Sequence, residues 1–331
     1  MSEEQDALGP QRTWSHLADR RRRPSEYEIV STHLLWSTDH PQMPWEVAPD
    51  GFMSDWYRKH RTGSPWTHEA WDTFRDPDEL VYRTYNILQD GQEAHVEGLL
   101  DEHDELGHDA RLAEDWLQTL ATLYTPGRYL MHTVQMASAY NVHMAPASTI
   151  ANCFMFQAGD ALRWVSRIAY RTRELANAHP SLGFARDERA QWEGHAAWLG
   201  FRGLMERVLV TYDWAEAFVA LNLVAKPAID EAYLRQFAAA ARRRDDTLLS
   251  LLMGAQLRDS DRSRRWSMAL SRFAAGEDAN AEAARSWLEK WTPLGDAAID
   301  AFCAHLPDGN SAATQAKSAA ASFRADLPFA R

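Results

Sequence analysis

The stretch DPDELVYRTYNILQDGQEAHVEGLL, residues 76–100, contains the signals of an amphipathic helix and of its start. Asp76 suits an N-cap, Pro77 suits the first helical position, and Glu79 follows the cap by three residues. Apolar residues then recur at helical spacing, namely Leu80, Val81, Leu88, Val96, Leu99 and Leu100. The pattern predicts a helix from residue 76 with one face on a core.

The chain beyond this stretch keeps the same character, because Ala, Leu, Arg and Glu, which favour helices, dominate it. We expect further helices at roughly 111–144, 147–177, 187–225, 229–243, 246–275 and 279–305. Breaks are expected at Pro126-Gly127, Pro146, Pro180 to Gly183, Pro227 and Pro293. No long run alternates as a strand would, so we predict an all-α body over residues 76–306.

The first 75 residues differ from this body. The first 77 residues hold seven of the 14 prolines and six of the 14 tryptophans. Proline disfavours long helices, so an irregular or extended arm is expected. Disordered segments are usually poor in aromatic residues, and the arm should therefore pack on its own helical body or on another chain. At the other end, residues 307–331 are rich in Ala and Ser and are expected to form a loosely held tail.

Charge and composition exclude several classes of protein. The 35 Lys and Arg against 47 Asp and Glu give a net charge of −12, which disfavours a nucleic-acid binder. Three basic runs, at 20–23, 242–244 and 262–265, are therefore expected to pair with acidic side chains. Cys153 and Cys303 match no zinc spacing and suit a reducing cytosol. The longest apolar stretch, roughly 215–225, is too short to cross a bilayer and the N-terminus is polar, so we expect a cytoplasmic protein.

Motifs of nucleotide binding and hydrolysis are absent, since there is no GxxxxGK[ST], GxGxxG or GxSxG. A cluster of His, Asp and Glu over residues 95–109 includes Glu105 and His108 at the Glu-x-x-His spacing. Di-iron sites in helical bundles need that spacing twice, with further Glu ligands. Here the spacing occurs once and next to Gly107, so we expect a solvated acidic helix end, with a metal site as the alternative.

Several longer motifs resemble the β subunits of toluene monooxygenase hydroxylases, which belong to the soluble bacterial multicomponent di-iron monooxygenases. They are RTWSHLA (12–18), DPDELVYRTYN (76–86), QDGQE (89–93), MAPASTIANC (144–153), DALRW (160–164), AYRTREL (169–175) and DWAEAFVALNLVAKP (213–227). The resemblance covers residues 12 to about 300. It implies a ferritin-like helical bundle that lacks the di-iron site carried by the related α subunit.

Aligned with the α-subunit ligand pattern, this chain keeps few ligands. The six degenerate positions are Gln135, Ala161, Trp164, Glu216, Asp259 and Arg262. Ala and Trp cannot ligate iron, and a protonated Arg brings positive charge where a cation would lie. We therefore expect no metal or catalytic residue in this chain, and we expect Arg262 to pair with Glu216 or Asp259.

The resemblance implies a structural β subunit in an (αβγ)2 hydroxylase that inserts one atom of O2 into an aromatic ring. Electrons would come from NADH through a reductase and a Rieske ferredoxin, and an effector protein would act on the complex. The arm would cross the α subunit, with Trp14, Trp36 and Trp45 as anchors. The alternative from another class, an independent ferritin-like di-iron oxidase, needs two complete Glu-x-x-His pairs. An RNA- or DNA-associated protein would need a basic surface stripe.

Overall fold

The computed structural model describes residues 17, 22–32, 51–307 and 309–329, and its regular elements within these ranges are all helical. This confirms the predicted all-α class. The α-helices of the body are α3 (Tyr82–Glu105), α4 (Glu114–Thr119), α5 (Gly127–Met144), α6 (Ser148–Ala178), α7 (Glu188–Gly194), α8 (Ala196–Leu209), α9 (Trp214–Phe218), α10 (Lys226–Ala228), α11 (Phe237–Arg243), α12 (Thr247–Ala274), α13 (Asp278–Cys303) and α14 (Gly309–Ala325).

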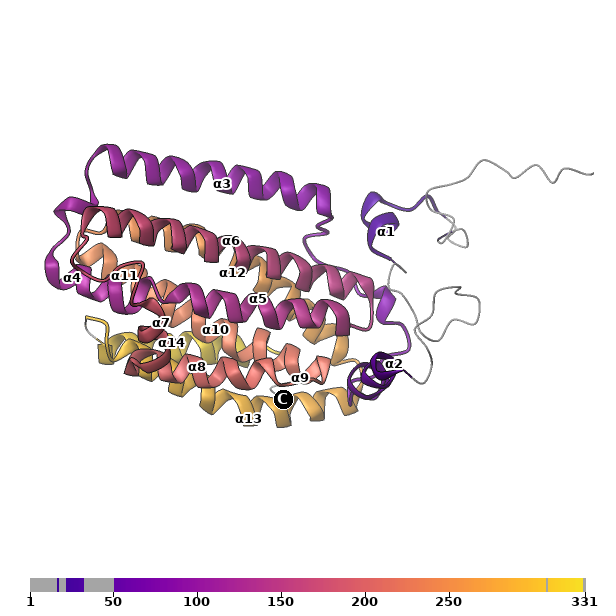
Figure 1. The fold of residues 1–331 in the computed structure, drawn as a ribbon. Coiled ribbons are helices and arrows are strands. Elements are labelled where there is room, and N and C mark those ends of the chain that lie inside the picture. The colour runs from indigo at the N-terminus through magenta and orange to yellow at the C-terminus, as the bar shows by residue number, and fades with distance from the viewer. Residues whose placement is uncertain (1–16, 18–21, 33–50, 308, 330–331) are drawn as a thin grey trace, which may run out of the picture.

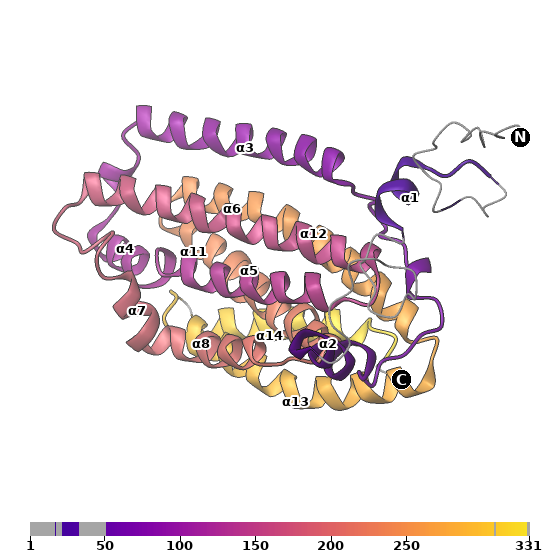
Figure 2. The same ribbon diagram turned by 45° about the vertical axis from the view of Figure 1, so that its right-hand side comes forward.

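Four long helical segments form the centre of the molecule: α5, α6, the segment 214–243 that contains α9 to α11, and α12. Residues 145–147 and 244–246 join these segments in pairs, and such short connections make antiparallel neighbours. α3 runs along the outside of α6 and α12, and α8 and α13 cover the opposite side (Figure 1, Figure 2). The arrangement places the polar faces of α6 and α12 between α3 and the rest of the bundle.

The start of α3 differs from the prediction. Residues 76–81 form a turn, and α3 begins at Tyr82. The Asp76 carboxylate accepts hydrogen bonds from the backbone N–H of Asp78 (3.1 Å) and of Leu80 (3.3 Å). Glu79 has a φ of 47°, which does not belong to a right-handed helix. The aspartate therefore closes a local turn instead of capping a helix.

Two predicted proline breaks are wrong. Pro227 lies in the unbroken segment 214–243, between two π-helical stretches, Val219–Ala225 and Ile229–Gln236. Because π-helical bonds shift the hydrogen-bonding register, the helix passes a residue that lacks an N–H without ending. Pro293 lies inside α13, which continues to Cys303.

The C-terminal segment is not a loosely held tail. Residues 309–325 form α14, and Ala312, Ala316 and Ala320 are buried along one side of it. These small residues recur every fourth position, so they lie on one face and let the helix approach its neighbours closely. Leu327 and Phe329, just beyond α14, are also buried.

The described part of the arm contains α1 (Glu26–Ser31) and α2 (Phe52–Tyr57), and it packs on the chain's own body. Trp66 is 2% exposed and its indole N–H donates to the Asn280 carbonyl at 2.9 Å. Its ring lies 5.8 Å from those of Trp214 and Phe329. Trp14, Trp36 and Trp45 lie outside the described residues. In the described ranges, no helix has the length and apolar character needed to span a membrane.

Candidate functional site

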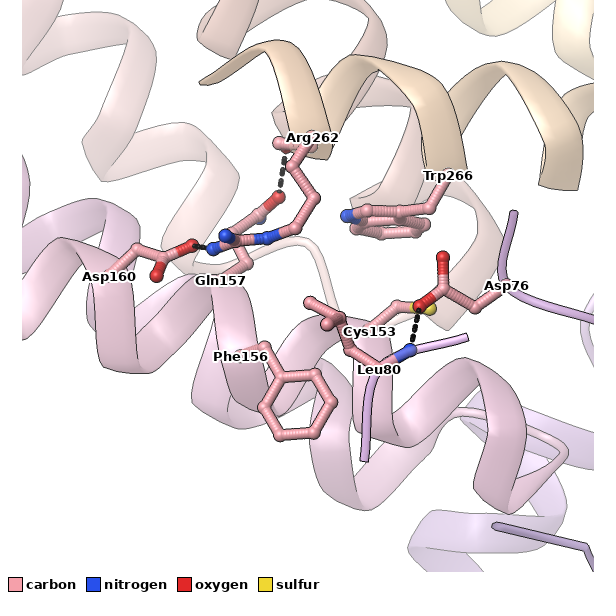
Figure 3. Close-up of a pocket in the computed structure, with 9 residues that line it drawn as sticks. Asp76, Leu80, Cys153, Phe156, Gln157, Asp160, Arg262 and Trp266 are labelled. Atoms are coloured by element: carbon pink, nitrogen blue, oxygen red, sulfur yellow. Dashed lines mark hydrogen bonds and ion pairs between the residues drawn. The ribbon is translucent and has the colours of Figure 1, made fainter. Parts of the chain in front are cut away.

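Two buried carboxylates, Asp160 on α6 and Asp259 on α12, lie in the middle of a polar cluster inside the bundle. We call this cluster the polar centre. Arg262 makes an ion pair with Asp160 through Nη2, and the same atom lies 3.5 Å from Oδ1 of Asp259. Figure 3 shows the Arg262 side chain reaching from α12 toward Asp160, with Trp266 on its other side. One guanidinium therefore neutralises part of the charge of two carboxylates.

α3 contributes two polar side chains to this cluster. The Tyr85 hydroxyl donates to Asp160 Oδ1 at 2.9 Å. The Gln89 amide donates to Oδ1 of Asp160 at 2.7 Å and to Oδ1 of Asp259 at 3.1 Å. Arg163 donates to the Gln89 amide oxygen, so the amide is bonded at both ends. These contacts attach α3 to the bundle mainly through hydrogen bonds, because few of its apolar residues are buried.

Three of the six predicted positions, Ala161, Trp164 and Asp259, lie close together beside the two carboxylates. The Trp164 indole N–H donates to Asp259 Oδ2 at 2.9 Å, and Arg163 pairs with the same oxygen. Ala161, Trp164 and Asp259 line a cavity of about 20 Å³ together with Lys226. That volume holds about one water molecule.

Lys226 and Asp230 extend the cluster along the segment 214–243. The ammonium of Lys226 lies 3.4 Å from Asp230 Oδ1 and from the Ser260 hydroxyl. Arg264 donates to Asp230 Oδ2 at 3.0 Å. Burial alone would raise the pKa of Asp230, but the Lys226 and Arg264 charges outweigh it, and the pKa of Asp230 lies below its ordinary value.

At Asp160 the effect of burial on the pKa outweighs that of the neighbouring positive charges. Its complete burial raises its pKa to about 6, the Asp259 carboxylate acts in the same direction, and Arg262 and Arg163 oppose both. A buried acid with this pKa exchanges its proton in weakly acidic solution. Burial also raises the pKa of the Tyr85 phenol, and the Asp160 carboxylate adds to that shift.

The structure does not bring Gln135 and Glu216 to this cluster. Gln135 is half-buried on α5 and does not line the cavity. Glu216 accepts hydrogen bonds from Lys290 (2.6 Å) and from the Trp291 indole (3.0 Å), both on α13. Of the two alternative partners predicted for Arg262, the structure shows Asp259 and not Glu216.

The sequence analysis did not single out Asp160, Arg163 and Asp230 of this cluster. It also missed Tyr85, Gln89 and Lys226. All three lie inside motifs that carry the family resemblance, DPDELVYRTYN, QDGQE and DWAEAFVALNLVAKP. Their position as polar residues within these helical motifs was the sequence feature that could have identified them. Lys226 could not be placed by counting, because its register depends on the π-helical stretches around Pro227.

The acidic segment 95–109 makes ion pairs with neighbouring helices. Glu97 pairs with Arg167 at 2.9 Å, Asp109 pairs with Arg171, and His108 lies 3.1 Å from Asp246. Among the residues that the structure describes, no group of three or more His, Cys, Asp and Glu is placed to hold a metal ion.

The three basic runs also contact acidic residues of the same chain, as expected. The pairs are Arg22–Glu28, Arg244–Asp115, Arg262–Asp160, Arg264–Asp230 and Arg265–Asp78.

The chemistry of the polar centre does not suit a pair of iron ions. Ala161 offers no ligand atom, the Trp164 indole is a donor only, and Lys226 and Arg262 add positive charge beside the carboxylates. Asp160 and Asp259 are already engaged by donors from α3, α6 and α12. The residues form a closed network of hydrogen bonds and ion pairs.

A family model described as Methane/Phenol/Alkene Hydroxylase matches residues 56–278. The chain is 49% identical over 297 residues to the "Toluene-4-monooxygenase system, hydroxylase component subunit beta" of Ectopseudomonas mendocina, covering 90% of this chain and 91% of that protein. The chain belongs to this hydroxylase family. A solved structure of toluene 4-monooxygenase hydroxylase with toluene in its resting active site contains a chain that superposes with a TM-score of 0.85. That chain is 48% identical, and the match covers 91% of this chain and 99% of that one.

More distant similarities are found to a protein sequence and to a solved structure, and the solved structure shares the helical fold. The small subunit of the propane 2-monooxygenase hydroxylase component of Mycolicibacterium smegmatis is 23% identical, over 95% of this chain and 85% of that subunit. A chain in a crystal structure of phenol hydroxylase from Pseudomonas sp. OX1 superposes with a TM-score of 0.81 at 20% identity, over 97% of both chains. The relatives named here include a subunit beta and a small subunit of the hydroxylase components of monooxygenase systems.

Proposed function

We propose that this chain is the non-catalytic β subunit of an aromatic-ring hydroxylase, in which an α subunit holds the di-iron centre. The observation that carries the proposal is the polar centre, where Trp164, Lys226 and Arg262 surround the two carboxylates. The 49% identity to a hydroxylase subunit beta supports the same role. The chain would stabilise the α bundle, and oxygen insertion would occur outside it.

The assembly that we propose is an (αβγ)2 heterohexamer. An NADH-dependent reductase and a Rieske ferredoxin would supply its electrons, and an effector protein would act on the complex. The substrate class is an arene such as toluene, the compound in the active site of the similar structure. The alternative, an independent di-iron oxidase, requires ligands that the polar centre does not supply.

The six positions Gln135, Ala161, Trp164, Glu216, Asp259 and Arg262 are proposed as remnants of a ligand set, of which Ala161, Trp164 and Asp259 line the central cavity. Trp14, Trp36 and Trp45 are proposed as anchors on the α subunit. Trp66 shows the other use of arm tryptophans, because it packs on the chain's own core.

One reconstitution tests the proposal. The chain is expressed with the α and γ subunits, and complex formation, toluene hydroxylation and iron are measured. We expect activity only when all three chains are present, with close to two irons per α chain. The chain alone, incubated with ferrous iron and desalted, should hold almost none.

The arm is tested in the same preparation by changing Trp14, Trp36 and Trp45 together to Ala. We expect loss of α from the purified complex with an unchanged unfolding curve for the variant chain. Two irons in the chain alone, or full hydroxylase activity without it, would refute the proposed role. Retention of α by the triple variant would refute the anchors only.

A further inference from the structure

The outward face of α5 and α6 carries no acidic side chain. Between Asp115 and Glu174 the only acidic residue is Asp160, and its carboxylate is buried in the polar centre. Other surface helices differ, since α3 alone holds seven Asp and Glu residues between Asp90 and Glu105. The chain has a net charge of −12, so a helical face without carboxylates stands out from the rest of its surface. Depletion of charged residues is typical of the middle of a protein interface.

The outward side of α6 also has the residue spacing of a helix-packing surface. Met155 and Leu162 are 40% and 50% exposed. Half-buried apolar residues lie between and beyond them, namely Ala158, Val165 and Ala169. The five positions are separated by three and four residues in turn, so they form one stripe along the helix. Side chains at this spacing pack into the surface of another helix.

The neighbouring helix α5 extends this apolar surface. Met136 is 38% exposed and Ala139 is half-buried. α6 lies between α3 and α5, and none of the described elements covers the stripe (Figure 1, Figure 2). With helices about 10 Å wide and about 1.5 Å of rise per residue, the outward sides of α5 (18 residues) and α6 (31 residues) together cover about 700 Å². A stable interface buries about 800 Å² on each partner, so the face is of the right size for one.

The charges of this face argue against a second copy of the chain as its partner. The exposed basic residues of the two helices are His132, His143 and Arg173. In a two-fold dimer through this face, these groups would come together with no carboxylate between them. A contact with an acidic surface of another copy, such as that of α3, would not close on itself and would give open filaments. The complement is therefore a different chain, whose helix is apolar in its middle and acidic around it.

We propose that the outward face of α5 and α6 docks the α subunit through a helix of that subunit. Apolar side chains of the helix lie against Met155 and Leu162, and its carboxylates lie beside His143 and Arg173. The identity of the partner rests on the proposed function, whereas the face itself rests on its exposed apolar stripe and its lack of acidic residues. The chain would thereby support the α bundle along two of its own helices.

The test is co-expression of the full chain, carrying an affinity tag, with the α and γ subunits. The ratio of α to tagged chain is measured in the purified complex. Leu162→Glu places a carboxylate in the middle of the stripe and should lower this ratio at least tenfold, because a charge there would be buried at the interface. Leu199→Glu, at a 52% exposed position on α8, is the matched control and should leave the ratio unchanged.

Leu162→Lys tests the charge of the partner at the same position. It should retain more α than Leu162→Glu does, because the carboxylates of the partner can pair with the ammonium group. Both variants should unfold in urea as the parent chain does, since Leu162 is half exposed in the chain alone. If Leu162→Glu does not fold, Met136→Glu on α5 tests the same face and should cause the same loss of α.

Full retention of α by Leu162→Glu and Met136→Glu would overturn the inference and leave the proposed function intact. So would a loss of γ alone, or better retention of α by Leu162→Glu than by Leu162→Lys. A parent chain that retains no α would refute the proposed function instead, so the two proposals fail in distinguishable ways.

Discussion

The two sides of the bundle are held together by different forces. Around Trp198 on α8, rings pack without ionic partners, with centroid distances of 5.9 Å to Tyr233 and 5.2 Å to Phe302. Between α3, α6 and α12, the contacts are hydrogen bonds and ion pairs around Asp160 and Asp259. Stability around Trp198 depends on how well the side chains fill the available volume. Stability around Asp160 and Asp259 depends on how well their charges are paired. The same chain should therefore respond to different changes on its two sides.

The largest expected effect is on the apolar side. Trp198→Ala should lower the free energy of unfolding by about 5 kcal/mol. It leaves a cavity and removes the indole N–H that donates a hydrogen bond to the Thr122 carbonyl at 2.7 Å. Urea denaturation of the full chain measures it. Leu199→Ala, on the same helix but 52% exposed, is the control and should change stability by less than about 0.5 kcal/mol. Similar losses in the two variants would show that the ring cluster does not stabilise the fold.

The next effect is on the polar side. Arg262→Leu should cost about 4 kcal/mol, since it leaves the buried Asp160 carboxylate without its ion-pair partner. The cost comes from a charge and not from a cavity. Adding Asp160→Asn removes that charge and should recover more than half of the loss in the same urea titration. A double variant no more stable than Arg262→Leu would mean that Arg262 stabilises the bundle through packing.

The contrast also explains which parts of the structure could be predicted from sequence. Helix-forming residues with helical apolar spacing dominate the body, and they predicted its class because burial of an apolar face depends mainly on local pattern. Helix ends were less predictable. Asp76 carries a cap signal, but its carboxylate closes a turn that also includes the positive φ of Glu79.

The C-terminal helix was missed for another reason. Ala and Ser content suggested a loose segment, yet alanines at 312, 316 and 320 recur at helical spacing and are buried. The low-complexity composition drew attention away from this helical spacing, which allows small residues to pack helices closely together. The partners of the polar centre were harder still, because Arg262 meets Asp160 from a helix about a hundred residues further along the chain.

A smaller effect is the pH dependence of stability, which we expect from Asp160 on the polar side and not from the ring cluster. Asp160 has a pKa of about 6 in the folded chain, above the ordinary value of 3.8, so the folded state binds a proton more tightly than the unfolded state does. Stability from this group is present below pH 4 and is lost as the pH rises from about 4 to about 6, with a total of up to about 3 kcal/mol.

Other acids titrate in the same range, so the measurement is the difference between the parent chain and Asp160→Asn, followed by urea denaturation across this window. The parent should lose stability relative to the variant as the pH rises, and Trp198→Ala should show the parent's pH dependence because it lies on the apolar side. A difference that stays constant with pH would mean that Asp160 keeps an ordinary pKa. The two carboxylates would then be fully neutralised by Arg262 and Arg163, and the polar centre would be as insensitive to protons as the ring cluster opposite.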